Sequence, residues 1–91
     1  MYARRVTLDN ATGLHVRPAT AFMELANRYR CAIRVLKDDL AADGKSAISL
    51  MLLVAGRGTA LTIEGTGDDE IEAVDALVAL VERQFADAGT R

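Results

Sequence analysis

The spacing of apolar residues in the first third of the chain predicts a strand followed by a helix. Arg4 to Leu8 alternates, with Val6 and Leu8 on one side, which is typical of a short half-buried strand. Apolar side chains at helical spacing follow Pro18, and they are Phe22, Leu25, Ala26 and Tyr29. Because proline is well tolerated in the first turn of a helix, we expect this helix to start just after His15.

The middle of the chain predicts a β-hairpin followed by a short helix. Ala32 to Lys37 alternates, Asp38-Asp39 suits a tight turn, and Leu40 to Asp43 can pair back. Ser46 is a favourable N-cap for a helix over Ala47 to Ala55, and the Gly-Arg-Gly that follows stops this helix.

The last third predicts a strand and a long helix. Ala60 to Glu64 places Leu61 and Ile63 on one strand face, and a glycine-rich turn follows over residues 65–68. Asp69 to Glu72 resembles a capping box. A helical stripe then runs through Ile71, Val74, Leu77, Val78, Val81 and Phe85. The resulting order, βαββαβα, suits an antiparallel sheet covered on one face by helices, which is an α+β fold.

The composition fits a single small domain over residues 1–91. Apolar residues make up 51% and charged residues 26% of the chain, as in ordinary globular proteins. A chain of 91 residues has room for one core but not for a large pocket beneath it. We therefore expect a ligand or partner to bind on the surface.

The charge of the chain argues against nucleic acid as a partner. The formal net charge is −2, whereas binding to phosphate backbones needs Lys and Arg clustered across one face. Residues 1–57 hold nine basic and five acidic side chains, and residues 58–91 hold two basic and eight acidic ones. A basic face in the N-terminal part would suit an acidic protein partner, and a solvated mixture of charges is the plainer alternative.

The single His and single Cys exclude a zinc site of the usual composition, so neither a metal nor a cofactor is expected. Cys31 is alone, which excludes an internal disulfide, and the N-terminal residues contain no signal-peptide apolar region. The longest apolar stretch, Ala47 to Ala55, spans nine residues, whereas a membrane helix needs about 20. These features predict a cytoplasmic protein without membrane insertion.

The histidine lies in Gly13-Leu14-His15-Val16-Arg17-Pro18, directly before a predicted helix. Amide groups at a helix start, the positive end of the helix dipole and the Arg17 guanidinium all favour an anion beside His15. Neutral imidazole is a nucleophile and Arg binds phosphate oxygens in a fork, which makes His15 a candidate phosphoryl acceptor. No nucleophile-elbow pattern supports a Ser-His-Asp site. The residues alone leave open that His15 is an ordinary surface residue in a loop.

A second candidate site combines Ser46 with the apolar helix that follows it. A phosphate on Ser46 would meet a helix N-terminus, although N-capping by itself accounts for a serine at this position. Ile48, Met51 and Leu52 belong to a helix so short and apolar that it need not bury every side. They are interpreted either as core residues or as an exposed docking patch.

At these residues the sequence resembles the histidine-containing phosphocarrier (HPr) family of the bacterial phosphotransferase system, together with its nitrogen-branch relative NPr. Gly13 to Ala19 is similar to the family's active-site motif, and Lys45-Ser46 falls where the family has its regulatory serine. Leu52-Leu53, Gly58-Thr59 and the acidic start of the last helix also fall at matching places. The resemblance covers essentially the whole chain.

The resemblance implies an open-faced β sandwich, with a four-stranded antiparallel sheet and three helices on one face. It implies that Enzyme I, which takes the phosphoryl group from phosphoenolpyruvate, phosphorylates His15 on Nδ1, and that an Enzyme IIA receives the group. Arg17 would bind and orient the phosphoryl group, and Ser46 would match the site of the ATP-dependent HPr kinase/phosphorylase in lineages that have it. The implied docking surface consists of Val16, Thr20, Ala47, Ile48, Met51 and Leu52.

Under this resemblance the protein is a monomeric phosphoryl carrier, a substrate of other proteins rather than an enzyme with its own turnover. The first alternative is a regulatory binding module of the nitrogen-branch type, in which phosphorylation changes the affinity for partner proteins without onward transfer. His15 and Arg17 favour the carrier, because pure binding needs neither a nucleophile nor a phosphate clamp. An RNA-binding α+β domain is disfavoured by the low aromatic content, 4%, and the negative net charge.

Overall fold

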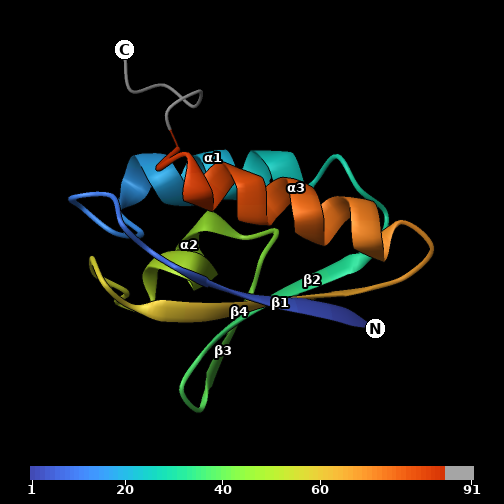
Figure 1. Cartoon of the computed structure of the whole chain (residues 1–91), viewed down its shortest axis with the longest axis horizontal. Coiled ribbons are helices and arrows are strands. Elements are labelled where there is room, and N and C mark those ends of the chain that lie inside the picture. The colour runs from blue at the N-terminus through green and yellow to red at the C-terminus, as the bar shows by residue number, and fades with distance from the viewer. Residues whose placement is uncertain (86–91) are drawn as a thin grey trace.

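The computed structural model of the protein, which describes residues 1–85, contains four strands and three helices (Figure 1). They are β1 (Tyr2–Thr7), α1 (Val16–Ala26), β2 (Ala32–Lys37), β3 (Leu40–Asp43), α2 (Ala47–Met51), β4 (Ala60–Thr66) and α3 (Glu70–Glu82). This is the predicted order, βαββαβα, and the helix after His15 begins at Val16 as expected.

The strands form one four-stranded antiparallel sheet in the order β1-β4-β2-β3. Val6 lies opposite Leu61 and Val35 lies opposite Ile63, so that apolar side chains of three strands share one face of the sheet. The three helices cover this face and leave the other face open (Figure 1). The predicted α+β fold, an open-faced β sandwich, is confirmed.

The core fills the space between the sheet and the helices. Its largest side chains with almost no exposure are Phe22, Phe85, Leu8, Leu50, Leu61, Ile63 and Leu77. Fully burying one such side chain contributes roughly 1.5–3 kcal/mol. Helix α2 has only five residues and is too short to be stable alone, so that burial of Leu50 against the other elements holds it in place.

The predicted hairpin is confirmed with its bounds, because β2 and β3 pair on either side of Asp38-Asp39. Asp38 takes a positive φ of 54°, which aspartate tolerates better than most residues. The first strand lies earlier than predicted, over Tyr2–Thr7 rather than Arg4 to Leu8. Leu8 is nevertheless fully buried just beyond the strand.

Two further boundaries differ from the sequence-based expectation. β4 continues to Thr66, within the predicted turn, because Thr66 pairs with Ala32 on the neighbouring strand. Helix α2 ends at Met51 rather than at Ala55. The chain leaves the helix there because Val54 adopts a positive φ of 52° and the Ala55 carbonyl accepts a hydrogen bond from Leu14 N at 2.9 Å.

The two long helices are shorter than their apolar stripes. α1 ends at Ala26, and Tyr29 packs half-buried against the core from beyond the helix. Phe85 is buried but lies past the end of α3 at Glu82. Ile71, which the stripe placed in the core, is 59% exposed, because α3 turns the Ala73 and Leu80 side of its surface inward instead.

The predicted capping box at the start of α3 is wrong. Asp69 occupies the N-cap, but its side chain makes no capping hydrogen bond. Its carboxylate instead accepts hydrogen bonds from Arg30 N and Cys31 N, both at 2.9 Å. These bonds, of which the one from Arg30 N has the largest effect, lower the pKa of Asp69. Burial raises the pKa of the neighbouring Cys31 thiol. Asp69 thus ties the start of β2 to the start of α3.

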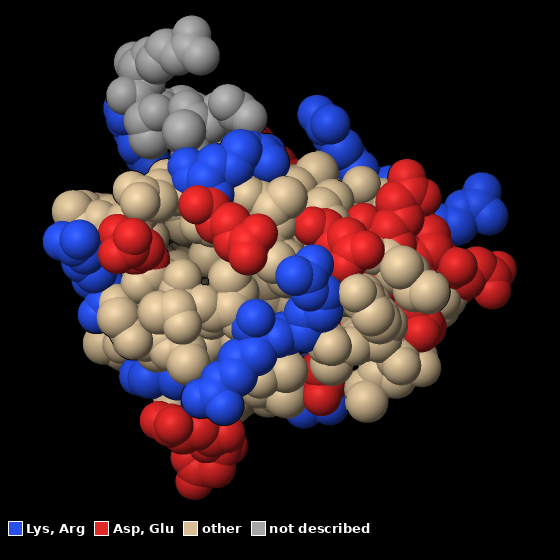
Figure 2. All heavy atoms as spheres, viewed as in Figure 1, with Lys and Arg blue, Asp and Glu red and all other residues tan. Residues whose placement is uncertain are grey.

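The surface carries both signs of charge. Lys and Arg side chains are interspersed with Asp and Glu over the face in Figure 2, and the lowest tip is acidic where the β2–β3 turn carries Asp38 and Asp39. Within residues 1–85, no helix is long and apolar enough to span a membrane. In the same part of the chain, no three His, Cys, Asp or Glu side chains are grouped as metal ligands would be.

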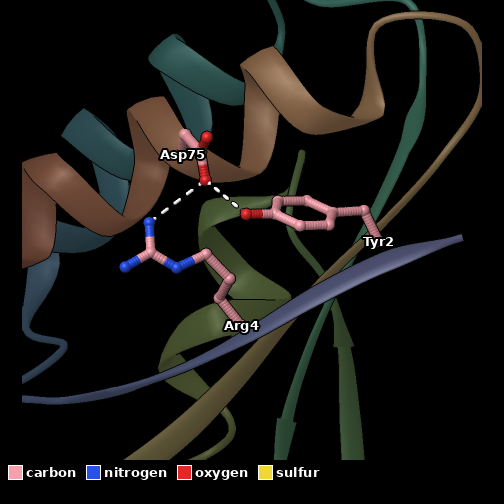
Figure 3. Close-up of polar contacts among 3 residues, drawn as sticks. All are labelled: Tyr2, Arg4 and Asp75. Carbon is pink, nitrogen blue, oxygen red and sulfur yellow. Dashed lines mark hydrogen bonds and ion pairs between the residues drawn. The ribbon is translucent and has the colours of Figure 1, made fainter.

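A polar cluster fastens β1 to α3 (Figure 3). The Tyr2 hydroxyl donates to Asp75 Oδ1 at 2.8 Å, and the Arg4 guanidinium donates to the same oxygen at 3.1 Å. The two hydrogen bonds, that of Tyr2 first, lower the pKa of Asp75, and the same bond raises the pKa of Tyr2. These two hydrogen bonds join residues that lie 73 and 71 positions apart in the sequence.

We expect Asp75→Asn to lower the melting temperature slightly at neutral pH. The folded-state pKa of Asp75 lies below the unfolded value near 3.8, so its contribution to stability is complete above that value and is lost as the pH falls through the folded pKa. Thermal melts should therefore show the largest difference from wild type near neutral pH and a shrinking difference under strongly acidic conditions. The exposed Glu72 on the same helix supplies the control, Glu72→Gln. A difference independent of pH would contradict this account.

Candidate functional site

The predicted phosphoryl acceptor, His15, is exposed at the N-cap of α1. Its backbone is extended, with φ −78° and ψ −177°, and its carbonyl accepts the first helical hydrogen bond, from Ala19 N at 2.9 Å. The imidazole makes no capping hydrogen bond. The helix start therefore depends on the His15 backbone, and the exposed ring takes no part in capping.

The loop that leads to His15 is fastened along residues 55–59. Leu8 N donates to Thr59 O at 2.9 Å, and Gly58 N donates back to Leu8 O at 2.7 Å. At the other end of the loop, Leu14 N donates to Ala55 O at 2.9 Å. The two bonds of Leu8 continue the pairing of β1 with β4 beyond the strands, and the bond of Leu14 fixes the direction in which the chain enters α1.

Two residues inside this loop shape its turn. The buried Asn10 donates from Nδ2 to Gly13 O at 2.7 Å, and Gly13 N donates to Asn10 O at 3.2 Å. Gly13 has a φ of +61°, and a Cβ at this position would overlap Ala55 O and come within 2.7 Å of Gly56 Cα. Only glycine satisfies both the conformation and the close approach. The glycine of the motif thus sets the position of His15 through backbone packing.

A shallow open hollow of about 350 Å³ lies beside His15, and we call it the His15 hollow. It is lined by Thr12, Leu14, His15, Val16, Met51, Val54, Ala55 and Gly56. Of the residues predicted for the site, His15, Val16 and Met51 are thus brought together. Sequence reasoning missed Thr12 and Val54. Val54 lay in a stretch predicted as helix, and its positive φ has no sequence signal.

The other predicted docking residues do not line the hollow. Ile48 and Leu52 are largely exposed on and just after α2, whereas Thr20 and Ala47 are half-buried. Helix α2 packs against α1, the helix whose N-cap is His15. The exposure of Ile48 and Leu52 favours the docking-patch interpretation over the core interpretation for these two residues. Met51, by contrast, is partly buried and packs against the core.

Arg17 is exposed in the first turn of α1, two residues beyond His15, and does not line the hollow. The first turn contains no acidic residue. A helix N-terminus without a carboxylate and with a guanidinium suits an anion. The electrostatics around His15 are therefore compatible with a phosphoryl group.

Ser46 caps α2, as predicted. Its Oγ accepts a hydrogen bond from Ser49 N at 3.2 Å. The preceding residue, Lys45, also makes a hydrogen bond with its side chain, from Nζ to Tyr29 O at 2.7 Å. Ser46 is half-buried and does not line the His15 hollow.

Comparison with known proteins gives a consistent result. Residues 2–83 match the family model for the HPr component of the phosphotransferase system, described as its phosphorylation site. The chain is 42% identical over 86 residues to the phosphocarrier protein HPr of Pseudomonas aeruginosa, covering 93% of this chain and 96% of that protein. It is 36% identical over 85 residues to the phosphocarrier protein NPr of Shewanella violacea, covering 93% of each. The crystal structure of HPr-C-His from Thermoanaerobacter tengcongensis superposes with a TM-score of 0.91 at 38% identity, covering 93% of this chain and 96% of that one.

Proposed function

Because this chain belongs to the HPr family of phosphocarrier proteins, we propose that His15 accepts a phosphoryl group from Enzyme I and passes it to an Enzyme IIA. The observation that carries the proposal is an exposed imidazole at the N-cap of α1, within the residues that match the family's phosphorylation-site model. A carrier must both receive and release the group, which requires a nucleophile that two partners can reach in turn.

The chemistry follows from the His15 environment. In neutral imidazole one ring nitrogen carries a lone pair, and in this proposal Nδ1 attacks the phosphorus while the bond to the donor breaks. The first turn of α1 and Arg17 then hold the phosphoryl oxygens. An N–P bond formed on a solvent-exposed ring is accessible to an Enzyme IIA, so the same geometry serves both uptake and delivery of the phosphoryl group.

The direct test of this proposal uses labelled phosphoenolpyruvate. Incubation with Enzyme I should place acid-labile label on the protein, and addition of an Enzyme IIA should remove it. Label that is accepted but never passed on would instead favour the alternative, a regulatory binding module whose phosphorylation state controls partner proteins. The similarity to a protein named NPr keeps that alternative open.

The proposal includes a docking surface for both partners. It comprises Val16 and Met51 beside His15, together with Thr20, Ala47, Ile48 and Leu52 around them. Support comes from the exposure of Ile48 and Leu52 and from the packing of α2 on α1. One surface that meets two partners in succession suits a monomer in the cytoplasm, and light scattering tests the oligomeric state.

Regulation through Ser46 is a further part of the proposal. A phosphate on Ser46, added by an HPr kinase/phosphorylase where the lineage has one, would place charge beside the exposed Ile48. Charge at the edge of an apolar surface must be desolvated on docking or face acidic groups of the partner, and both effects oppose association. Such a phosphate would therefore slow phosphorylation of His15.

We expect Ser46→Asp to raise the KM of Enzyme I for this protein several-fold without lowering its stability. Aspartate is a good N-cap, so it can accept from Ser49 N as the serine does. Ser46→Ala is the matched control, because it removes the cap without adding charge. Loss of the cap should lower the free energy of unfolding by about 1 kcal/mol. Kinetics and melting curves of the three proteins should separate the two effects. Equal KM values for wild type and Ser46→Asp would leave Ser46 with its capping role alone.

A further inference from the structure

We propose that Val54 is a specificity-determining residue, an apolar side chain that docks against an apolar surface of the protein that phosphorylates His15. The inference rests on the proposed function, because it requires that a donor protein reaches His15. It adds a residue that lies outside the predicted docking surface and outside the predicted active-site motif.

The conformation of Val54 is unfavourable for its residue type. Its φ is +52°, and the left-handed region is disfavoured for β-branched side chains, which crowd the backbone there. Residues in such conformations persist where the surrounding structure holds them, and they cluster at functional sites. Glycine or asparagine at this position would satisfy the same backbone with less strain.

The backbone around Val54 is held on both sides. Val54 N donates to Met51 O at 3.1 Å. Lys37, which reaches over from β2, donates from Nζ to Leu53 O at 2.9 Å and to Val54 O at 3.2 Å. The next residue, Ala55, accepts the hydrogen bond from Leu14 N that positions the His15 loop. Val54 therefore lies between backbone held by Lys37 and Met51 and the residue that anchors the His15 loop.

Burial in the protein itself does not compensate for the strain. Val54 is 79% exposed. Phe85 also has a positive φ, but it is buried, and Asp38 and Gln84 are polar. Among residues 1–85, Val54 is thus the one non-glycine residue at positive φ that is both apolar and exposed.

The position of Val54 identifies what covers it. Val54 lines the His15 hollow together with Val16 and Met51. Transfer to His15 requires direct contact with the donor, and a protein interface of ordinary size covers about 800 Å² on each partner. An interface centred on His15 therefore buries the side chains of the hollow, and an apolar side chain among them gains most against an apolar surface.

The test compares Val54→Asn with wild type as acceptors of label from Enzyme I and phosphoenolpyruvate. Asparagine keeps the backbone conformation and removes the apolar contact, so the melting temperature should stay equal or rise. The KM for the acceptor should increase about tenfold while kcat stays the same, since burying a valine contributes about that much to association. Val54→Gly removes the side chain altogether and should give the same pattern.

Ile71→Asn is the matched control. Ile71 is an exposed apolar residue in the first turn of α3, at the opposite end of the helical layer from the start of α1 (Figure 1). This variant should keep the wild-type KM. If the wild type takes up label and both Val54 variants keep the wild-type KM, the inference is overturned and the proposed function stands. A wild-type protein that takes up no label would overturn both.

Discussion

We expect His15→Ala to take up no phosphoryl group from Enzyme I while melting at the wild-type temperature. The loss should be complete because the imidazole is the nucleophile in the proposed reaction and His15 is the only histidine of the chain. The fold should persist because the side chain is exposed and makes no capping hydrogen bond. What remains at the N-cap is the backbone carbonyl that accepts from Ala19 N, and alanine supplies the same group.

The measurement combines acid-labile label with a thermal melt of the same samples. Thr12→Ala is a suitable control, since Thr12 is exposed and lines the same hollow. It should accept label, which would show that a change in the hollow does not by itself abolish transfer. Acid-labile phosphate on His15→Ala would place the acceptor elsewhere and refute the proposed chemistry.

The second large effect is expected at Gly13. Gly13→Ala should lower the free energy of unfolding by about 2–4 kcal/mol, because it combines a strained φ with displacement of neighbouring backbone. The added Cβ would push against Ala55 O, the acceptor of the bond from Leu14 N. Phosphorylation of His15 should slow as well, since the bond from Leu14 N to Ala55 O fixes the residue directly before His15.

Two other glycines of the same region separate the two causes. A Cβ at Gly58 would meet nothing within 4 Å, but its φ is +89°, so Gly58→Ala reports conformational strain alone, about 1 kcal/mol. A Cβ at Gly56 would also meet nothing within 4 Å, and its φ is not in the positive range, so Gly56→Ala should be close to neutral. Urea unfolding of the three variants gives the ranking. Equal losses for Gly13→Ala and Gly58→Ala would show that the close approach to Ala55 does not constrain the loop.

The elements that follow from local patterns were predicted well. The hairpin from Ala32 to Asp43 has the predicted bounds because β alternation and the Asp38-Asp39 turn act within a few residues of one another. The start of α1 after His15 and the Ser46 cap of α2 are equally local, since each depends on a residue and the turn that follows it. The family motif around His15 is contiguous as well, so the candidate acceptor was visible in the sequence.

The errors occurred where distant segments compete for the same backbone or side chain. Asp69 was expected to cap its own helix, but it accepts from Arg30 N and Cys31 N, which lie almost 40 residues away in the sequence. Helix propensity favoured continuing α2 to Ala55, whereas the hydrogen bond from Leu14 N uses the Ala55 carbonyl in another direction. Propensity gives tenths of a kcal/mol per residue, and satisfied long-range contacts outweigh it.

The sequence by itself determined the order of the elements, the apolar face of each strand and the histidine of the proposed reaction. Only the tertiary structure decided what surrounds that histidine. Met51 and Val54 join His15 in one hollow because β4 pairs with β1 and brings residues 55–59 against the loop before α1. Periodicity records which face of an element is apolar, whereas a site is made by contacts between elements. Those contacts depend on strand register and on where a helix ends, which neighbouring residues alone do not specify.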